Sequence, residues 1–151
     1  MTGFHSLVGL IVVASLAATG CAESSYTPTS PSSVGGSLAF SADQLAGTWN
    51  LRSIQLTGQA EKARPPGTNY TLTLTDGRLS TRVDCNVCSG GFALSGRTLT
   101  AGPALACTKA ACPTMAFENA YTGLLSGDST VTLSDGMLVL SSARGVLGFT
   151  R

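Results

Sequence analysis

Four cysteines lie close together in one stretch of the chain, DCNVCSGGFALSGRTLTAGPALACTKAACP, which runs from residue 84 to residue 113. They are Cys85, Cys88, Cys107 and Cys112, with two, eighteen and four residues between successive members. Two C-x2-C pairs separated by about 15 to 20 residues are typical of a four-thiolate zinc site, although the second pair here is more widely spaced. A C-x2-C pair can also lower a thiol pKa for redox chemistry. In an oxidising compartment, the even number instead favours two disulfides.

The first twenty residues indicate which compartment applies. The run from Leu7 to Ala18 is apolar and uncharged, too short to span a bilayer comfortably but suited to the core of a signal peptide. It ends in LAATGC, which resembles the lipobox of bacterial lipoproteins, where the cysteine thiol receives a diacylglyceryl group. We therefore expect residues 1–20 to be a lipoprotein signal peptide and Cys21 to be lipidated, so that the protein is held at a membrane.

Two departures from that pattern leave an alternative open. Ala18 stands where a lipobox usually has Leu, and the amino-terminal region contains His5 but neither Lys nor Arg. The alternative is an ordinary secretory signal or membrane anchor followed by a coincidental cysteine. An exported chain seldom meets zinc with free thiols, and the C-x2-C pair lies in a predicted loop rather than at a helix start. Structural disulfides are therefore favoured, and four cysteines permit three pairings.

Residues 21–42 change in composition to a segment dense in Ser, Pro, Thr and Gly. Such a segment buries too little apolar surface to offset the entropy of ordering it, so we expect a flexible tether. Ala22, rather than Asp, follows Cys21, as in lipoproteins sent on to the outer membrane. The expected location is the cell envelope, lipid-anchored, facing the periplasm if the host has an outer membrane.

Composition and charge exclude several functions. Nine Lys and Arg against eight Asp and Glu give a net charge of +1 and form no basic stripe, so nucleic acid is not an expected partner. His5 is the one histidine and lies in the leader, which excludes histidine-dependent triads and histidine-ligated metal in the domain. Asp84 and Glu118 flank the cysteines and could approach each other, without the spacing of an acid and base pair. We predict no catalytic residue, no cofactor and no metal site.

Residues 43–151 carry the signals of antiparallel β-structure. Asp76-Gly77, Ser95-Gly96 and Asp135-Gly136 each separate two alternating segments, which predicts three hairpins. A slip in alternation within residues 47–57 indicates a bulge, and Trp49 is expected to cap the core. Residues 113–127 instead repeat apolar side chains every three and four positions, which predicts a single helix of about three turns. The expected fold is mainly β, a small antiparallel barrel-like domain with a single α-helix.

Across residues 45–150 the chain resembles the META domain family, found in heat-shock-associated bacterial lipoproteins and other envelope proteins. The resemblance rests on the opening LAGTWNL, the central CNVCSGGFAL and the later TKAACP. Asp84, Phe92 and Ala111 depart from the family pattern at the scale of packing. Cys85 and Cys112 stand at the family's usual cysteine positions and the other two lie just inside them. The resemblance thus implies a nested pairing, Cys85 with Cys112 and Cys88 with Cys107.

The resemblance also implies a function. It suggests a non-enzymatic envelope lipoprotein that supports stress tolerance or envelope integrity, with an unidentified envelope protein as a further partner. Two alternatives share the opening strand LAGTW: a small β-barrel inhibitor of secreted proteases and a lipocalin-like carrier of a small ligand. Neither has a counterpart of the two cysteine-containing motifs. A carrier predicts an apolar cavity inside the barrel, and an inhibitor predicts a flexible terminal segment that enters a protease.

Overall fold

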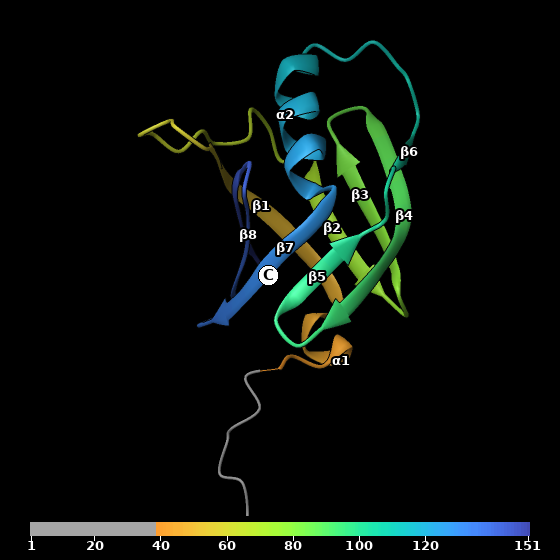
Figure 1. Cartoon of the computed structure of the whole chain (residues 1–151). Helices are drawn as coiled ribbons and strands as arrows, with labels where there is room; N and C mark the ends of the chain where they lie inside the picture. Colours follow the sequence, from red (N-terminus) through yellow and green to blue (C-terminus); the bar gives the residue numbers. More distant parts are fainter. Residues whose placement is uncertain (1–38) are drawn as a thin grey trace, which may run out of the picture. The chain divides into compact units, whose positions relative to one another are not determined.

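The structure, a computed structural model, describes residues 39–151 (Figure 1). The predicted signal peptide, the lipidation of Cys21 and the predicted tether as far as residue 38 lie outside the described residues. Near the start of the described part of the chain, the Phe40 N–H donates to the Gly96 carbonyl at 3.0 Å. No helix within residues 39–151 is long and apolar enough to cross a bilayer.

Strands dominate the domain, and every hairpin predicted from the sequence is present. In chain order the elements are α1 (Ala42–Leu45), β1 (Gly47–Leu56), β2 (Tyr70–Thr75), β3 (Arg78–Val83), β4 (Asn86–Ser95), β5 (Thr98–Ala101), β6 (Ala106–Cys107), α2 (Met115–Leu125), β7 (Gly127–Ser134), β8 (Met137–Ser142) and β9 (Gly145–Thr150). The helix predicted over residues 113–127 is α2. The short turn of helix α1 was not predicted.

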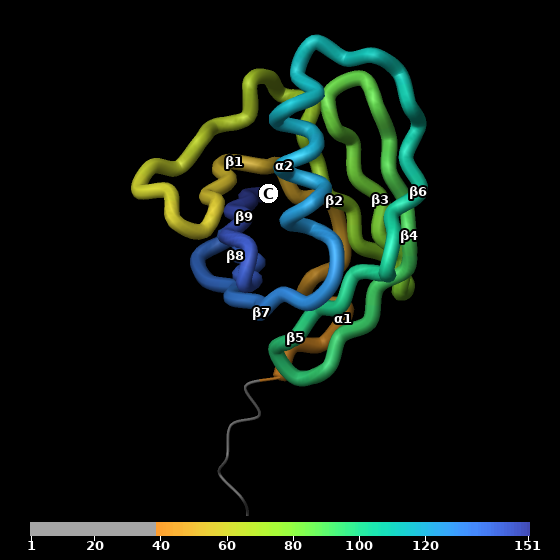
Figure 2. The backbone as a smooth tube through the Cα atoms, turned by 45° about the horizontal axis from the view of Figure 1, so that its top comes forward, coloured from red at the N-terminus to blue at the C-terminus, as the bar shows by residue number. Residues whose placement is uncertain are grey.

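The strands close into an antiparallel barrel. Their order is β3-β2-β1-β9-β8-β7-β5-β4, and β4 pairs back with β3, while β6 pairs with β4 outside this ring. Closure removes the free strand edges that an open sheet would expose. In Figure 2 the tube of these strands curves around a central space, and α2 lies across it. The sequence prediction of a small, mainly β, antiparallel barrel-like domain is therefore confirmed; the single helix it predicted is α2, and the short α1 is additional.

The turns have the backbone that their sequences favour. At Asp76-Gly77 and Asp135-Gly136 both residues have positive φ, 50° and 72° in the first turn and 50° and 73° in the second. This is the combination that a two-residue hairpin turn of type I′ requires, and Asp followed by Gly tolerates it best. The predicted irregularity in β1 is a register shift between Leu51 and Ser53 where β1 pairs with β9. It returns Ile54 to the barrel interior, since Leu51 and Ile54 are both buried.

Apolar side chains fill the barrel interior. Trp49, Tyr121 and Phe149 are the largest of the fully buried side chains and belong to one continuous core cluster. The Trp49 indole N–H donates to the Leu45 carbonyl at 2.9 Å, so α1 satisfies the polar end of this ring. Trp49 therefore caps the core, as the sequence predicted, and is 1% exposed.

One local expectation was wrong. The C-x2-C pair was expected in a loop between hairpins, but Cys88 lies within β4 and is fully buried. Cys85 occupies the two-residue turn between β3 and β4, beside Asp84 with a positive φ of 57°. The reason is that β4 continues through Ser89-Gly90-Gly91, which pairs with Arg78 to Ser80 of β3. These glycines and serine looked like turn residues in the sequence, yet they extend the strand.

Gly145 tests the packing between the barrel and α2. A Cβ at this position would collide with the Gln55 carbonyl oxygen and lie 2.9 Å from the Leu124 side chain, at a φ of +150°. We expect Gly145→Ala to lower the free energy of unfolding by about 2–3 kcal/mol, measured by urea denaturation. Gly123→Ala is the matched control, because that helical glycine has open space around it. It should raise stability by about 0.5–1 kcal/mol; equal effects of the two substitutions would contradict this packing.

Candidate functional site

The four cysteines of the sequence motif form two disulfides. Cys85 pairs with Cys112, with 5.8 Å between their Cα atoms, and Cys88 pairs with Cys107, with 4.0 Å between theirs. This is the nested arrangement that the family resemblance implied. The outer bond joins the β3–β4 turn to the segment that leads into α2, and the inner bond joins directly opposed residues of β4 and β6. In the chain-entropy model, loops of this length stabilise a fold by about 3 kcal/mol each.

This pairing leaves no thiolates for the two alternative chemistries. Cys85 and Cys88 are bonded to different partners, so they do not form the dithiol of a C-x2-C redox centre. Sulfurs in disulfides are also not zinc ligands. Within residues 39–151, no group of three or more His, Cys, Asp and Glu side chains is placed to hold a metal ion.

Asn86 organises the polar contacts between the two disulfides. It is fully buried, and its Oδ1 accepts from the Ala110 N–H and the Thr108 hydroxyl, both at 2.8 Å. Its Nδ2 lies 3.0 Å from the Ala110 carbonyl and 3.1 Å from each carboxylate oxygen of Glu118. An amide nitrogen has two hydrogens, so these acceptors share them. Asn86 thus ties β4 to the incoming chain and to α2 at once.

Glu118 is a buried carboxylate, 6% exposed, in the first turn of α2. The partial positive charge at a helix N-terminus favours an anion there, and the Asn86 amide supplies a hydrogen-bond donor. Asp84 is also near this end of the helix, but its carboxylate accepts from the Thr114 hydroxyl at 2.5 Å. Each carboxylate therefore has its own partner, and no hydrogen bond joins Asp84 to Glu118 among the described residues.

Tyr70 extends the Asp84 contact into the core. Since the Thr114 hydroxyl donates to Asp84, the Tyr70 phenol donates to Thr114, at 2.6 Å. Burial raises the pKa of Tyr70 above its usual value, the Thr114 hydrogen bond opposes this, and the nearby Asp84 and Glu118 charges raise it further. The sequence analysis did not single out Asn86, Thr114 or Tyr70. Asn86 could have been found from its place in the CNVC motif.

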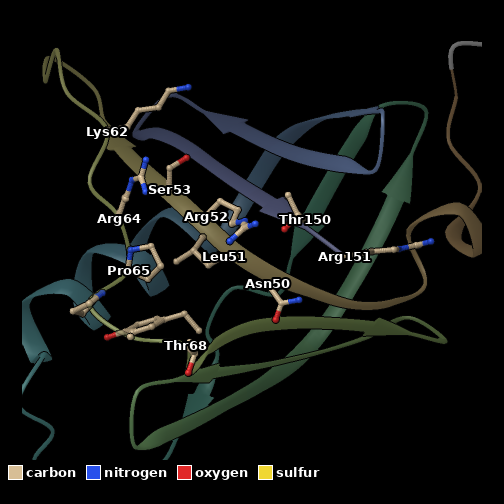
Figure 3. A pocket seen from close by; sticks show the side chains of 13 residues that line it. Asn50, Leu51, Arg52, Ser53, Lys62, Arg64, Pro65, Thr68, Thr150 and Arg151 are labelled. Carbon is tan, nitrogen blue, oxygen red and sulfur yellow. The ribbon is translucent and has the colours of Figure 1, made fainter.

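A basic cleft lies beside β1. We use this name for a surface cavity of about 960 Å³ between β1, the loop of residues 57–69 and the end of β9. Figure 3 shows Arg52 near its centre, with Lys62 and Arg64 from the loop on one side and Arg151 towards the other. The sequence analysis missed this cleft because its cations are separated by up to 99 positions along the chain. The remaining lining residues are Asn50, Leu51, Ser53, Pro65, Pro66, Gly67, Thr68, Tyr70 and Thr150.

The fold defines the protein as a small closed β-barrel crossed by one helix, with a disulfide-linked junction at the start of that helix. Residues 43–151 match the META domain, and the chain belongs to the META domain family. The sequence has no significant match among curated proteins.

Three solved structures share the fold. An NMR structure of a protein from Burkholderia xenovorans superposes with a TM-score of 0.59 at 24% identity, covering 75% of this chain and 89% of that one. A second protein structure determined by NMR gives a TM-score of 0.54 at 24% identity, covering 74% and 94%. A DUF4847 family protein from Bacteroides vulgatus gives 0.50 at 14% identity, covering 70% and 92%.

Asn86→Ala tests whether the junction is held by this amide. The substitution leaves the buried Glu118 carboxylate without its donor and removes the hydrogen bonds to Ala110 and Thr108, so we expect the free energy of unfolding to fall by about 3 kcal/mol. Urea denaturation of the oxidised protein measures it. The exposed Asn119 of α2 gives the matched control, Asn119→Ala, which should change stability by less than about 0.5 kcal/mol. A comparable loss from both variants would show that Asn86 has no special role.

The pH dependence of stability at alkaline pH tests the burial of the Tyr121 phenol. Its hydroxyl donates to Thr81 at 2.7 Å, and burial raises its pKa well above 10.0. A phenol whose pKa is higher in the folded than in the unfolded state contributes stability below the unfolded pKa, which is lost as the pH rises above about 10. We expect stability to fall from about pH 10 upward, and to fall less steeply in Tyr121→Phe. Tyr26→Phe, in the predicted tether, should leave the pH profile unchanged; identical profiles for all three proteins would be the contrary result.

Proposed function

We propose that this protein is an exported, lipid-anchored envelope protein whose META domain acts without catalysis and supports stress tolerance or envelope integrity. The anchor in this proposal is a diacylglyceryl group on Cys21, and residues 21–42 form the tether. An envelope protein is the further partner.

The pairing of all four domain cysteines carries this proposal. Disulfides persist in oxidising compartments and are rare where thiols are kept reduced. Both bonds sit in the folded domain, with Cys88 and Cys112 buried and Cys107 half-buried. A domain built around two such bonds is suited to the cell exterior or the periplasm. The apolar run from Leu7 to Ala18 and the LAATGC sequence supply the matching export signal.

The chemistry of the described residues supports a role in binding rather than catalysis. Glu118 and Asp84 are the carboxylates nearest the disulfides, and each is engaged by one neutral hydrogen-bond donor. The Thr114 hydroxyl that donates to Asp84 also accepts from Tyr70, and within residues 39–151 there is no histidine to serve as the base of a catalytic triad.

The carrier alternative gains no support from the interior. Trp49, in the opening strand that the alternative shares, is 1% exposed, and Leu72, Leu99 and Leu138 are fully buried in the same cluster. A carrier of this barrel size needs a cavity where these side chains pack. The inhibitor alternative shares with this chain the opening strand, and no observation favours it.

Acyl labelling tests the anchor and the export together. The full chain, produced in a bacterium with a radiolabelled fatty acid, should incorporate label and sediment with membranes. Cys21→Ser should lose label completely and appear in the soluble fraction, because the acceptor thiol is gone. A host strain that lacks the protein should lose viability under envelope stress, and the unsubstituted chain should restore it better than Cys21→Ser.

The control is Ser25→Ala, a substitution in the same segment that removes a hydroxyl and keeps Cys21. Label and fractionation should be unchanged. Labelling that persists after Cys21→Ser, or free thiols at Cys85 and Cys112 in the exported protein, would count against the proposal.

A further inference from the structure

The basic cleft concentrates positive charge in a chain that otherwise carries little. Four of the nine Lys and Arg of the sequence line it, and none of the lining residues is acidic. The whole chain has a net charge of only +1, so the cleft differs sharply from the rest of the molecule. Like charges held together repel one another and raise the energy of the fold unless an anion lies between them.

Three of these cations are free to meet a ligand. Arg52, Lys62 and Arg64 are exposed, and within residues 39–151 their side chains form no ion pair and no hydrogen bond. Glu61 is adjacent to Lys62 in the sequence, but it does not line the cleft. Their charges are therefore not neutralised by the described part of the chain.

The fold holds these cations in place. Arg52 projects from β1, which pairs with β2 on one side and β9 on the other. The Ala63 carbonyl accepts from the Ile54 N–H at 2.9 Å, and the Ala63 N–H donates to the Ile54 carbonyl at 2.8 Å. These two bonds hold the loop against β1. Lys62 and Arg64 flank Ala63, and residues two apart along an extended segment point to the same side. Both therefore face the cleft, as Figure 3 shows.

Arg151 is fixed at the other end. Its guanidinium donates to the carbonyls of Gln44 and Ala46, at 3.1 and 2.9 Å, and its Cζ lies 4.3 Å from the centre of the Trp49 ring. These contacts turn the guanidinium towards α1, and in Figure 3 the Arg151 side chain points away from Arg52. Arg151 therefore borders the cleft, and Arg52, Lys62 and Arg64 are the three cations that can meet a ligand in it.

The rest of the lining narrows the chemistry of that ligand. Ser53, Thr68 and Thr150 contribute hydroxyls, and Asn50 contributes an amide, all able to donate to an anionic oxygen. Guanidinium groups bind phosphate oxygens in a two-pronged geometry. A ligand with one carboxylate would balance only one of the three positive charges of Arg52, Lys62 and Arg64. From Asn50 to Ser53 the strand extends about 10 Å, which is room for two phosphate-sized groups.

We propose that the basic cleft binds a phosphate ester that carries at least two negative charges, with Arg52, Lys62 and Arg64 as its principal ligands. Such an ester is present either in a soluble molecule or in an anionic lipid headgroup. The inference does not depend on the lipid anchor or on the proposed stress role, because it rests on the geometry of the cleft.

The test uses the full chain with Cys21→Ser, so that no lipid attaches it to a vesicle. Inorganic pyrophosphate is the probe, and isothermal titration calorimetry at low salt measures its affinity for the protein. The combined variant Arg52→Gln, Lys62→Gln and Arg64→Gln should weaken binding by about tenfold or more, since charged hydrogen bonds to phosphate are lost. The matched control, Arg78→Gln, Lys109→Gln and Arg82→Gln, removes three exposed cations outside the cleft and should change affinity less than about twofold.

A second arm distinguishes the two sources of phosphate. Vesicles of phosphatidylcholine, with and without cardiolipin, whose headgroup carries two negatively charged phosphodiester groups, are sedimented with the same three proteins. If the protein binds the anionic vesicles and only the cleft variant loses this binding, the ester belongs to a lipid headgroup. If the protein binds pyrophosphate but not the vesicles, the ester is a soluble one. The proposal would be overturned if the protein did not bind pyrophosphate or if the cleft variant and the control variant lost the same affinity. Tighter binding of citrate than of pyrophosphate would also overturn it.

Discussion

Asn86 bonds to two parts of the chain at once, and the position of α2 depends on it. The chain between β6 and α2 has almost no strand partners, since β6 is only Ala106–Cys107. Its backbone groups therefore find hydrogen bonds elsewhere. Asn86 supplies them at Ala110 and also meets Glu118 in the helix. Because the disulfides hold the same segment on both sides, α2 begins at a fixed point, and its buried face enters the barrel through Tyr121 and Leu125.

Because α2 packs across the barrel, its side chains fill the interior space in which a ligand could otherwise bind. Tyr121 packs edge-on to Tyr70 and Phe149, with ring centres 6.0 and 6.3 Å apart, and these rings occupy space that a carrier would need for its ligand. The barrel interior is thus occupied by side chains. On the outer surface of the barrel, strands fix side chains without competing for the core. The basic cleft beside β1 is a surface of this kind.

The fold was more predictable than the site because different kinds of signal define them. Hairpin turns such as Asp76-Gly77 and the three-to-four spacing around Tyr121 are local, so they can be recognised in a single sequence. The nested disulfide pairing came from resemblance to a family, since four cysteines alone allow three arrangements. Arg52 and Arg151 line the same cleft only because β1 pairs with β9, and nothing in their sequence neighbourhoods encodes that pairing. Asn86 was missed for a related reason: its burial depends on chain segments that follow it by more than twenty residues.

The nested disulfides also alter what cleavage of the chain can accomplish. The segment between Cys88 and Cys107 contains the β4–β5 turn and is enclosed by both bonds. A protease that cuts there would produce two fragments still joined covalently, through the inner bond and again through the outer one. Neither fragment could diffuse away, and the paired strands would remain close enough to reassociate. In an environment rich in proteases, nicking of this loop would therefore not by itself release any part of the domain.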